Sequence, residues 1–175
     1  KPIDAIKNGI AYVTEDRKGE GLVLPMSIAH NTTLPSMQEL SNKVFIKSLE
    51  EKTKTEKILS ELKVKMASSK LAVKNLSGGN QQKVVLAKWM MKDPDVIIFD
   101  EPTRGIDVGA KAEIYKLMNE FVAKGKAIIM ISSEMPEAMG MSDRILVISN
   151  HKLSGEFNRD EFSQDSIMTM AMRYM

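Results

Sequence analysis

The chain has 175 residues, of which 43% are hydrophobic, a formal net charge of +2, no cysteine and only two histidines. This composition supports one domain with a buried core and excludes a disulfide framework or a thiolate metal site. The longest apolar run, AIIMI at 127–131, is far shorter than the ~20 residues of a membrane-spanning helix, and we expect no secretory signal. Because the chain begins with Lys1, we expect a piece of a longer protein.

A short strand and then a helical region are predicted in the first half of the chain. GIAYV at 9–13 is typical of a strand, and the polar TEDRKGEG after it indicates a loop. From about 27 to 92, apolar residues recur near helical spacing. They are Ile46, Leu49, Ile58, Leu59 and Leu62, followed by a stripe of Val84, Ala87 and Met91. The lysine excess at 41–75 fits a solvated helical face better than a docking surface, and it does not imply nucleic acid.

Strands and helices alternate in the second half. The apolar runs at 96–99, 127–132 and 144–148 predict buried strands of a parallel sheet. Asp107 is predicted to cap a helix that ends at Gly125. The apolar face of that helix is predicted to consist of Ile114, Leu117 and Phe121.

The last part of the chain predicts local structure. A short helix carries Pro136 in its first turn, and RILVISNHKLSGEF predicts a hairpin that turns at Asn150-His151. A final helix is expected from about Ser163. The fold class is therefore α/β: a mainly parallel sheet flanked by helices, with a helical insertion and a C-terminal β-hairpin plus helix. We expect an α/β core at 1–26 and 93–175 and a helical subdomain at 27–92.

Polar residues follow two of the predicted strands. Asp100 and Glu101 come directly after one, and Ser132, Ser133 and Glu134 after the next. The carboxyl ends of parallel strands face the ligand crevice of such a sheet. An apolar strand followed by Asp-Glu suits a nucleotide hydrolase, in which the first carboxylate holds Mg²⁺ through water and the second polarises an attacking water. By itself the pattern fits equally well a strand end that caps the next helix.

LSGGNQQK at 76–83 is suited to holding an anion, although the chain contains no GxxxxGK(S/T) phosphate loop. Ser77, Gly78 and Gly79 open a predicted helix whose free amides carry the positive end of its dipole, and glycines permit close approach of a phosphate. SGG alone would fit a plain helix cap. Its place 23 residues before Asp100, in the order LSGGNQQK then VIIFDEPTRGID, favours phosphate chemistry.

These stretches resemble the ATP-binding cassettes of ABC transporters. The matching segments are LSGGNQQKVVLAKWMMKDP, VIIFDEPTRGIDVGAKAEIY and ISSEMPEAMGMSDRILVI. With GIAYVTEDRKGEGL and EPTRGIDVGAK, the chain is similar more narrowly to the second cassette of double-cassette ATPases that power import of simple sugars such as ribose, galactose or xylose. The resemblance runs from about Asp4 to the C-terminus. It implies ATP and Mg²⁺ as cofactors and a partial nucleotide-binding domain without its phosphate loop.

The resemblance implies a role for individual residues. Asp100 would hold Mg²⁺ through water, Glu101 would be the general base, and residues 104–107 would form a loop that crosses to a partner cassette. The residues expected to contact ATP are Leu76, Ser77, Gly78, Gly79, Asn80, Gln81, Asp107, Glu15 and Ser133. Since two cassettes of this family pair head to tail, the anion at Ser77 would be the γ-phosphate of an ATP held by the other cassette.

Three departures from the general family pattern predict an asymmetric pair of sites. Glu15 stands where the family has glutamine, and Ser133 where it has histidine. A carboxylate adds negative charge near the phosphates, and serine cannot carry a positive charge. The phosphate loop would lie before residue 1. We therefore expect Ser77 to complete a competent site, and the site that contains Glu101 to be weaker or mainly structural.

The resemblance also implies partners and a location. We expect a partner cassette in the N-terminal half of the full-length protein, membrane permease subunits, indirectly a sugar-binding protein, and no nucleic acid, at the cytoplasmic face of the cell membrane. The loop of Glu15, Asp16 and Arg17 would lie near the permease, or Arg17 and Lys18 would be an exposed pair. A pairing cassette that does not hydrolyse ATP, and a soluble ABC-type ATPase of DNA repair or translation, remain as alternatives. The sequence does not identify the sugar.

Overall fold

The structure is a computed structural model, and it describes residues 1–41 and 45–175. Contacts between residues divide the chain into two compact units, Lys1–Ile129 and Met130–Met175. The predicted division into an α/β core at 1–26 and 93–175 and a helical subdomain at 27–92 has different boundaries from these two units. It stays a prediction. The two units are described separately below.

A three-stranded sheet of order β1-β2-β3 carries part of the candidate site. Its strands are β1 (Ile10–Val13), β2 (Val96–Asp100) and β3 (Ala127–Ile131), which confirms the three predicted strands. β1 and β2 pair in parallel, with Val13 opposite Phe99. The side chains of Ala11, Val13, Ile97 and Phe99 are at most 2% exposed. Because the carboxyl ends of parallel strands lie at the same edge, the loops that follow β1 and β2 begin side by side.

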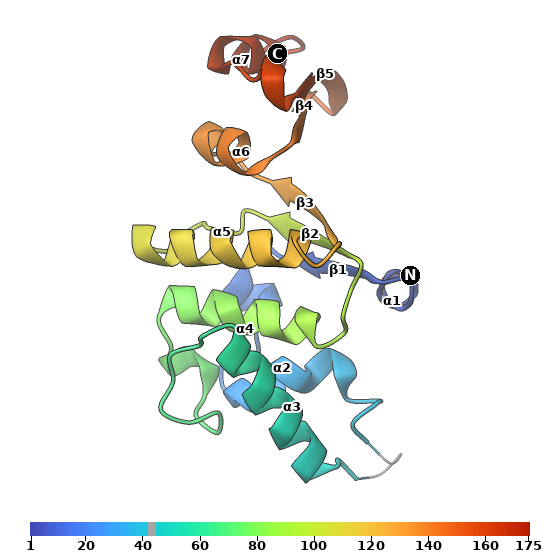
Figure 1. The fold of residues 1–175 in the computed structure, drawn as a ribbon, viewed down its shortest axis with the longest axis vertical. Coiled ribbons are helices and arrows are strands. Elements are labelled where there is room, and N and C mark those ends of the chain that lie inside the picture. The colour runs from blue at the N-terminus through green and yellow to red at the C-terminus, as the bar shows by residue number, and fades with distance from the viewer. Residues whose placement is uncertain (42–44) are drawn as a thin grey trace. The chain divides into compact units, whose positions relative to one another are not determined.

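Helices fill the rest of the first unit (Figure 1). They are α1 (Pro2–Lys7), α2 (Ile28–Thr33), α3 (Ser48–Glu61), α4 (Gly78–Met90) and α5 (Val108–Val122), with short helical turns at Arg17–Gly21, Leu34–Ser36 and Val73–Asn75. α2, α3 and α4 contact one another, and α4 also contacts β1 and α5. Helix α4 is therefore the central helix of this unit.

The predicted helical stripes are buried in part. Leu59 and Leu62 of the first stripe are at most 2% exposed, as expected, but Leu49 is 80% exposed. Ile46 is also exposed, because α3 begins only at Ser48 and Ile46 precedes it. The second stripe occurs as expected at the α4 positions Val84 and Ala87, which are both fully buried, whereas Met91 is half-buried at the end of the helix.

Helix α5 begins and ends where its sequence predicts. The Asp107 carboxylate accepts a hydrogen bond from the backbone N–H of Ala110 at 2.9 Å and so caps the helix. The chain leaves the helix through Gly125, whose φ of 79° favours glycine. Its buried face is Ile114, Met118 and Phe121, with the predicted Leu117 half-buried beside them.

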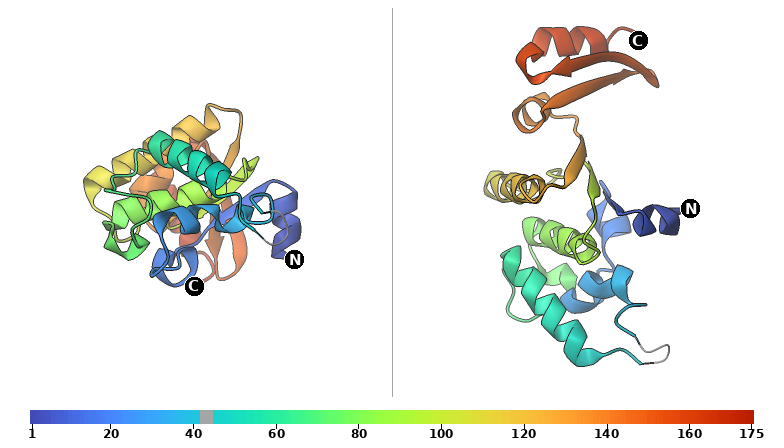
Figure 2. Two further views of the ribbon diagram at one scale, coloured as in Figure 1. Left: turned by 90° about the horizontal axis from the view of Figure 1, so that it is seen from below. Right: turned by 45° about the vertical axis from the view of Figure 1, so that its right-hand side comes forward.

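The second unit is a hairpin with a helix packed on it. Its elements are α6 (Met135–Met141), β4 (Arg144–Ser149), β5 (Lys152–Asn158) and α7 (Gln164–Ala171). β4 and β5 pair antiparallel around Asn150 and His151, whose φ values of 45° and 61° fit a two-residue hairpin turn. Helix α7 contacts both strands and lies along the hairpin (Figure 2).

One expectation for the second unit is wrong. The run at 144–148 is apolar and follows a helix, which predicted a further strand of the parallel sheet. In the described residues β4 instead belongs to a two-stranded sheet with β5. The tight turn at Asn150-His151 brings the next strand alongside at once, so β5 pairs with one edge of β4 as its local antiparallel partner. Within the described ranges, the helices are too short or too polar to cross a membrane.

A pair of leucines on α3 tests the position of the core. Leu59→Ala is expected to lower the free energy of unfolding by about 2–5 kcal/mol, because it leaves a cavity at a fully buried site. Leu49→Ala is the matched control, since Leu49 lies on the same helix but is 80% exposed, and we expect a change within about 0.5 kcal/mol. Urea unfolding followed by the fluorescence of Trp89 measures both, and equal losses would contradict the assignment.

Candidate functional site

The predicted anion-binding stretch forms the first turn of α4. Ser77 is the N-cap residue, but its hydroxyl makes no capping hydrogen bond to this turn among the described residues. That hydroxyl instead accepts a hydrogen bond from Asn80 Nδ2 at 3.0 Å, and Asn80 Oδ1 accepts one from the backbone N–H of Lys65 at 2.7 Å. In the described part of the chain, the N–H groups of this first turn therefore donate no hydrogen bond to the side chain of their own cap residue, and free amides at a helix N-terminus can bind an anion.

Internal packing accounts for Gly79 and leaves little room for a side chain at Gly78. A Cβ atom at Gly79 would stand 2.6 Å from Ala110 Cβ on α5. At Gly78 it would stand 2.9 Å from Arg17 Nη2 and 3.4 Å from the carbonyl oxygen of Gly105. The absence of side chains therefore lets α5 and Arg17 approach the start of α4. That the glycines also admit a phosphate stays a prediction.

A hydrogen bond between the Gln81 side chain and the Leu76 backbone stabilises the segment before α4. Gln81 is buried, and its Nε2 donates to the Leu76 carbonyl at 3.2 Å and to the Val73 carbonyl at 3.5 Å. The Gln81 Oε1 atom is buried and has no hydrogen-bond partner among the described residues. The Gln81 amide therefore supports the backbone before α4, whereas its predicted contact with ATP remains untested.

Asp100 lies at the end of β2, and β1 supplies its neighbour. The Tyr12 hydroxyl donates a hydrogen bond to Asp100 Oδ2 at 2.5 Å. Tyr12 stands opposite Ile98, so Tyr12, Ile98 and Asp100 lie on one face of the sheet. The hydrogen bond to Asp100, with desolvation and the negative charge of that carboxylate, raises the pKa of Tyr12 above its ordinary 10.0. Tyr12 therefore orients the carboxylate that is expected to hold Mg²⁺.

Glu101 turns the chain sharply where β2 ends. Its φ of 46° lies in the left-handed region, which is uncommon for a residue with a side chain. Such a conformation costs about 1–3 kcal/mol and is concentrated at functional sites. The side chain of Glu101 is half-buried. These features agree with the predicted general base, a role that stays a prediction.

The loop after Glu101 is tied to the loop after β1. Glu15 and Arg104 form an ion pair between exposed side chains. Arg17 is half-buried, and its guanidinium donates to the carbonyl oxygens of Arg104 at 2.8 Å and Gly105 at 3.2 Å. Arg17 is thus not the exposed loop residue that one alternative expected, whereas Lys18 is exposed.

Asp107 and Ser133, which are also predicted to contact ATP, do not belong to α4. The Asp107 carboxylate caps α5 by accepting a hydrogen bond from the Ala110 N–H. Ser133 is exposed and belongs to the second compact unit, after β3. Their predicted contacts with ATP stay predictions. Sequence reasoning missed the roles of Tyr12 and Arg17, because both depend on the register of β1 against β2, which no local pattern reveals.

Asp100 fits a magnesium site in part. Mg²⁺ commonly keeps several waters and takes one or two carboxylates together with the phosphates of its substrate. In residues 1–41 and 45–175 no group of three or more His, Cys, Asp and Glu side chains gathers to hold a metal. Asp100 can thus supply one oxygen ligand or bind through water, and the other ligands would come from water and phosphate.

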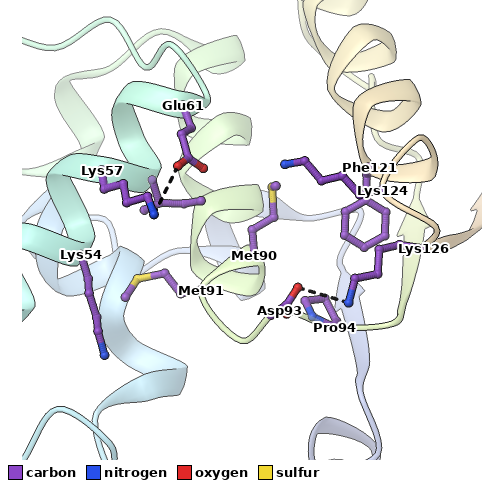
Figure 3. A pocket seen from close by; sticks show the side chains of 11 residues that line it. Lys54, Lys57, Glu61, Met90, Met91, Asp93, Pro94, Phe121, Lys124 and Lys126 are labelled. Atoms are coloured by element: carbon purple, nitrogen blue, oxygen red, sulfur yellow. Dashed lines mark ion pairs between the residues drawn. The ribbon is translucent and has the colours of Figure 1, made fainter.

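A separate hollow of about 350 Å³ lies between the ends of α3 and α4 and the end of α5 (Figure 3). Phe121 and Met90 contribute to its apolar wall, and its lysines are Lys54, Lys57, Lys124 and Lys126. Three of these lysines already face carboxylates: Lys54 pairs with Glu50, Lys57 with Glu61, and Lys126 with Asp93 and Asp95. This mixture of charges does not favour an anion, and none of the predicted ATP contacts lines the hollow.

Comparison with known proteins establishes the family. Residues 1–104 match the family model described as "ABC transporter". Ribose import ATP-binding protein RbsA of Clostridium perfringens is 55% identical over 172 residues, which are 97% of this chain and 34% of the relative. Xylose import ATP-binding protein XylG of Thermoanaerobacter pseudethanolicus is 56% identical over 170 residues, with the same shares. The chain belongs to the ABC transporter family, and it spans about a third of the length of the relatives it matches.

Solved structures agree on the fold. A dimeric ATP-binding cassette in a post-hydrolysis state, bound to ADP and Pi, superimposes with a TM-score of 0.73 at 20% identity, over 89% of this chain and 65% of that chain. An ATP-binding cassette of an ABC transporter gives a TM-score of 0.77 at 21% identity, over 98% of this chain and 72% of that one. The α/β fold expected from the resemblance is therefore confirmed as the fold of an ATP-binding cassette.

The contact between α4 and α5 can be tested at Gly79. Gly79→Ala is expected to destabilise the chain by about 1–3 kcal/mol, because the new Cβ would overlap that of Ala110. Adding Ala110→Gly should recover part of this loss, although glycine in α5 itself costs about 1 kcal/mol. Gly140→Ala on α6 is the control, since a Cβ there has open space and should not destabilise. If the double variant lost as much free energy of unfolding as the two single variants lose together, the contact between Gly79 and Ala110 would be refuted.

Tyr12 should titrate above its ordinary pKa of 10.0. The Tyr12 contribution to stability is then present below about pH 10 and is lost as the pH rises through the folded-state pKa, because the unfolded chain releases this proton first. Phenolate absorbance measures the titration, and Tyr12→Phe identifies which of the three tyrosines gives the signal. Asp100→Asn should lower the Tyr12 pKa towards 10.0. No change in that variant would disprove the hydrogen bond.

Proposed function

We propose that this chain is most of the second ATP-binding cassette of an ATPase that powers import of a simple sugar of the ribose, galactose or xylose class. The observation that carries the proposal is the start of α4: Ser77 leaves the first turn uncapped, and the Arg17 guanidinium lies beside Gly78. A helix N-terminus with a cation next to it attracts phosphate. The names of the relatives, ribose import and xylose import ATP-binding protein, support the choice of sugar.

The chain would act on ATP at two places. When bound, Mg·ATP supplies the phosphoanhydride bond that is hydrolysed. The amides of Gly78 and Gly79, with the Ser77 hydroxyl, would contact the γ-phosphate of an ATP held mainly by a partner cassette. At the end of β2, Asp100 would hold Mg²⁺ through water, and Glu101 would accept the proton of the attacking water.

The proposed assembly has three further components. A partner cassette in the N-terminal half of the full-length protein would face Ser77. Permease subunits would receive the conformational change that accompanies ATP hydrolysis, and a sugar-binding protein would deliver the sugar. The complex would lie at the cytoplasmic face of the cell membrane, with no nucleic acid as ligand. The solved cassette that is described as dimeric and as bound to ADP and Pi supports a paired arrangement.

A second candidate function is a pairing cassette that does not hydrolyse ATP at its own site. Ser133 and Glu15, in place of the histidine and glutamine of the general pattern, favour it. The ion pair with Arg104 weakens this argument for Glu15, because the cation offsets the negative charge near the phosphates. The sugar-import names of the relatives do not favour a soluble ATPase of DNA repair or translation. Such an ATPase would bind nucleic acid in a salt-dependent manner.

ATP hydrolysis by the full-length protein, assembled with its permease, tests the proposal. Ser77→Ala is expected to lower kcat about 10²-fold, as expected when a donor to the transferring phosphate is lost. Glu101→Gln is expected to lower kcat less than about threefold, because the site that contains Glu101 is the weaker one. Ser60→Ala on the exposed surface of α3 is the matched control.

Two outcomes of this experiment count against the proposal. Equal losses for Ser77→Ala and Glu101→Gln would refute the asymmetry between the two sites. A wild-type protein whose ATP turnover, measured with its permease and the sugar-binding protein present, is not stimulated by ribose, galactose or xylose would refute the function itself.

A further inference from the structure

Arg17 joins three segments that are far apart in the sequence. Its guanidinium donates through Nη1 to the Arg104 carbonyl at 2.8 Å and through Nη2 to the Gly105 carbonyl at 3.2 Å. The same Nη2 lies 2.9 Å from the point where a Cβ of Gly78 would stand. The loop after β1, the loop after β2 and the first turn of α4 therefore meet at one side chain.

The Arg17 side chain is itself held firmly. The Asp16 carboxylate accepts hydrogen bonds from the backbone N–H groups of Lys18 at 3.1 Å and Gly19 at 2.9 Å, which fixes the helical turn in which Arg17 lies. Arg17 Cβ lies 3.5 Å from the point where a Cβ of Gly21 would stand, and Arg17 Nε is buried without a hydrogen-bond partner among the described residues. A planar guanidinium that reaches two successive carbonyls fixes their direction as well as their distance, which a flexible ammonium does not do.

The position of this charge is not explained by the stability of α4. A cation beside a helix N-terminus opposes the helix dipole. The carbonyl oxygens of Arg104 and Gly105 offset this repulsion, because their negative ends point at the guanidinium. Gly105 has a φ of 66°, so the turn that presents these carbonyls also depends on a glycine. The three segments are thus arranged around Arg17, at a cost to the helix itself.

We propose that Arg17 is a positioning residue that fastens the Arg104–Gly105 turn to the first turn of α4. A displacement of the loop after β1 would then move the Ser77 turn and the loop expected to face the partner cassette together. The functional part of this inference rests on the proposed ATPase activity. The structural part concerns contacts within the chain, and it is tested independently of ATP.

The structural part is tested by amide hydrogen exchange of the full-length protein without nucleotide. Arg17→Ala should accelerate exchange in the peptide that covers residues 104–107 by about tenfold, because that turn loses its anchor. Arg17→Lys should give a smaller acceleration, since an ammonium can replace one of the two hydrogen bonds. Lys18→Ala is the matched control, because Lys18 is the adjacent cation and is exposed. Unchanged exchange in Arg17→Ala would overturn the proposal.

The functional part is tested by steady-state ATP hydrolysis of the same variants. Arg17→Ala should lower kcat about tenfold, as misplacement of a catalytic segment does, with KM for ATP within about twofold of wild type, and Arg17→Lys should recover part of kcat. Faster exchange with unchanged kcat would overturn the functional part. A wild type that does not hydrolyse ATP would refute the proposed function, while the exchange result still decides the role of Arg17. If Arg17→Ala does not fold, Arg17→Lys decides, and exchange at wild-type rate in that variant would overturn the proposal.

Discussion

The candidate site depends on the parallel pairing of β1 with β2. This pairing joins residues that are more than eighty positions apart, and it sets Val13 opposite Phe99. Since both strands end at the same edge of the sheet, the loops that follow them run side by side. The Tyr12–Asp100 hydrogen bond, the Glu15–Arg104 ion pair and the Arg17 contacts all join these two strands or their loops. A shift of the register by one residue would turn Tyr12 to the other face and break the first of them.

Helix α4 is connected to the loop after β1 at two points. Near its start, Gly78 admits the Arg17 guanidinium. Further along, the buried Lys88 donates a hydrogen bond from Nζ to the Gly21 carbonyl at 2.8 Å. Desolvation lowers the pKa of Lys88, which means that its charged form is held in the interior at a cost in free energy. The loop after β1 therefore contacts helix α4 both near its start and near its end.

The ion pair between Glu15 and Arg104 bears on the proposed asymmetry between the two ATP sites. Glu15 replaces a neutral amide of the general family pattern, and a second negative charge near Mg·ATP would be repulsive by itself. Arg104 compensates for it through the ion pair, so the pair contributes little net charge. Arg104 is thus a compensating residue of the same loop that carries Gly105 and Asp107. This compensation explains how an acidic residue is tolerated at the position without restoring the chemistry of glutamine.

Local patterns determined much of the secondary structure. The strands at 10–13, 96–100 and 127–131 are short apolar runs, Asp107 and Gly125 mark the two ends of α5, and Asn150-His151 marks the hairpin turn. The LSGGNQQK stretch at 76–83 and the Asp-Glu end of β2 are also evident from the sequence, because their residue types indicate the same chemistry wherever they lie. These features depend on backbone preferences and side-chain chemistry over a few residues, and a sequence states them directly.

Which of these segments meet depends on the packing of the folded chain. β4 pairs with β5 and does not join the parallel sheet, Leu49 is exposed although it fits the helical stripe, and Gly79 is required by Ala110 of a different helix. Tyr12 and Arg17 gained their roles only from the register of β1 against β2. Such contacts join residues far apart in the chain, and their energies depend on distances of a few ångströms. For this reason the elements and the kind of chemistry follow from local sequence, whereas the residues that position the site follow from packing.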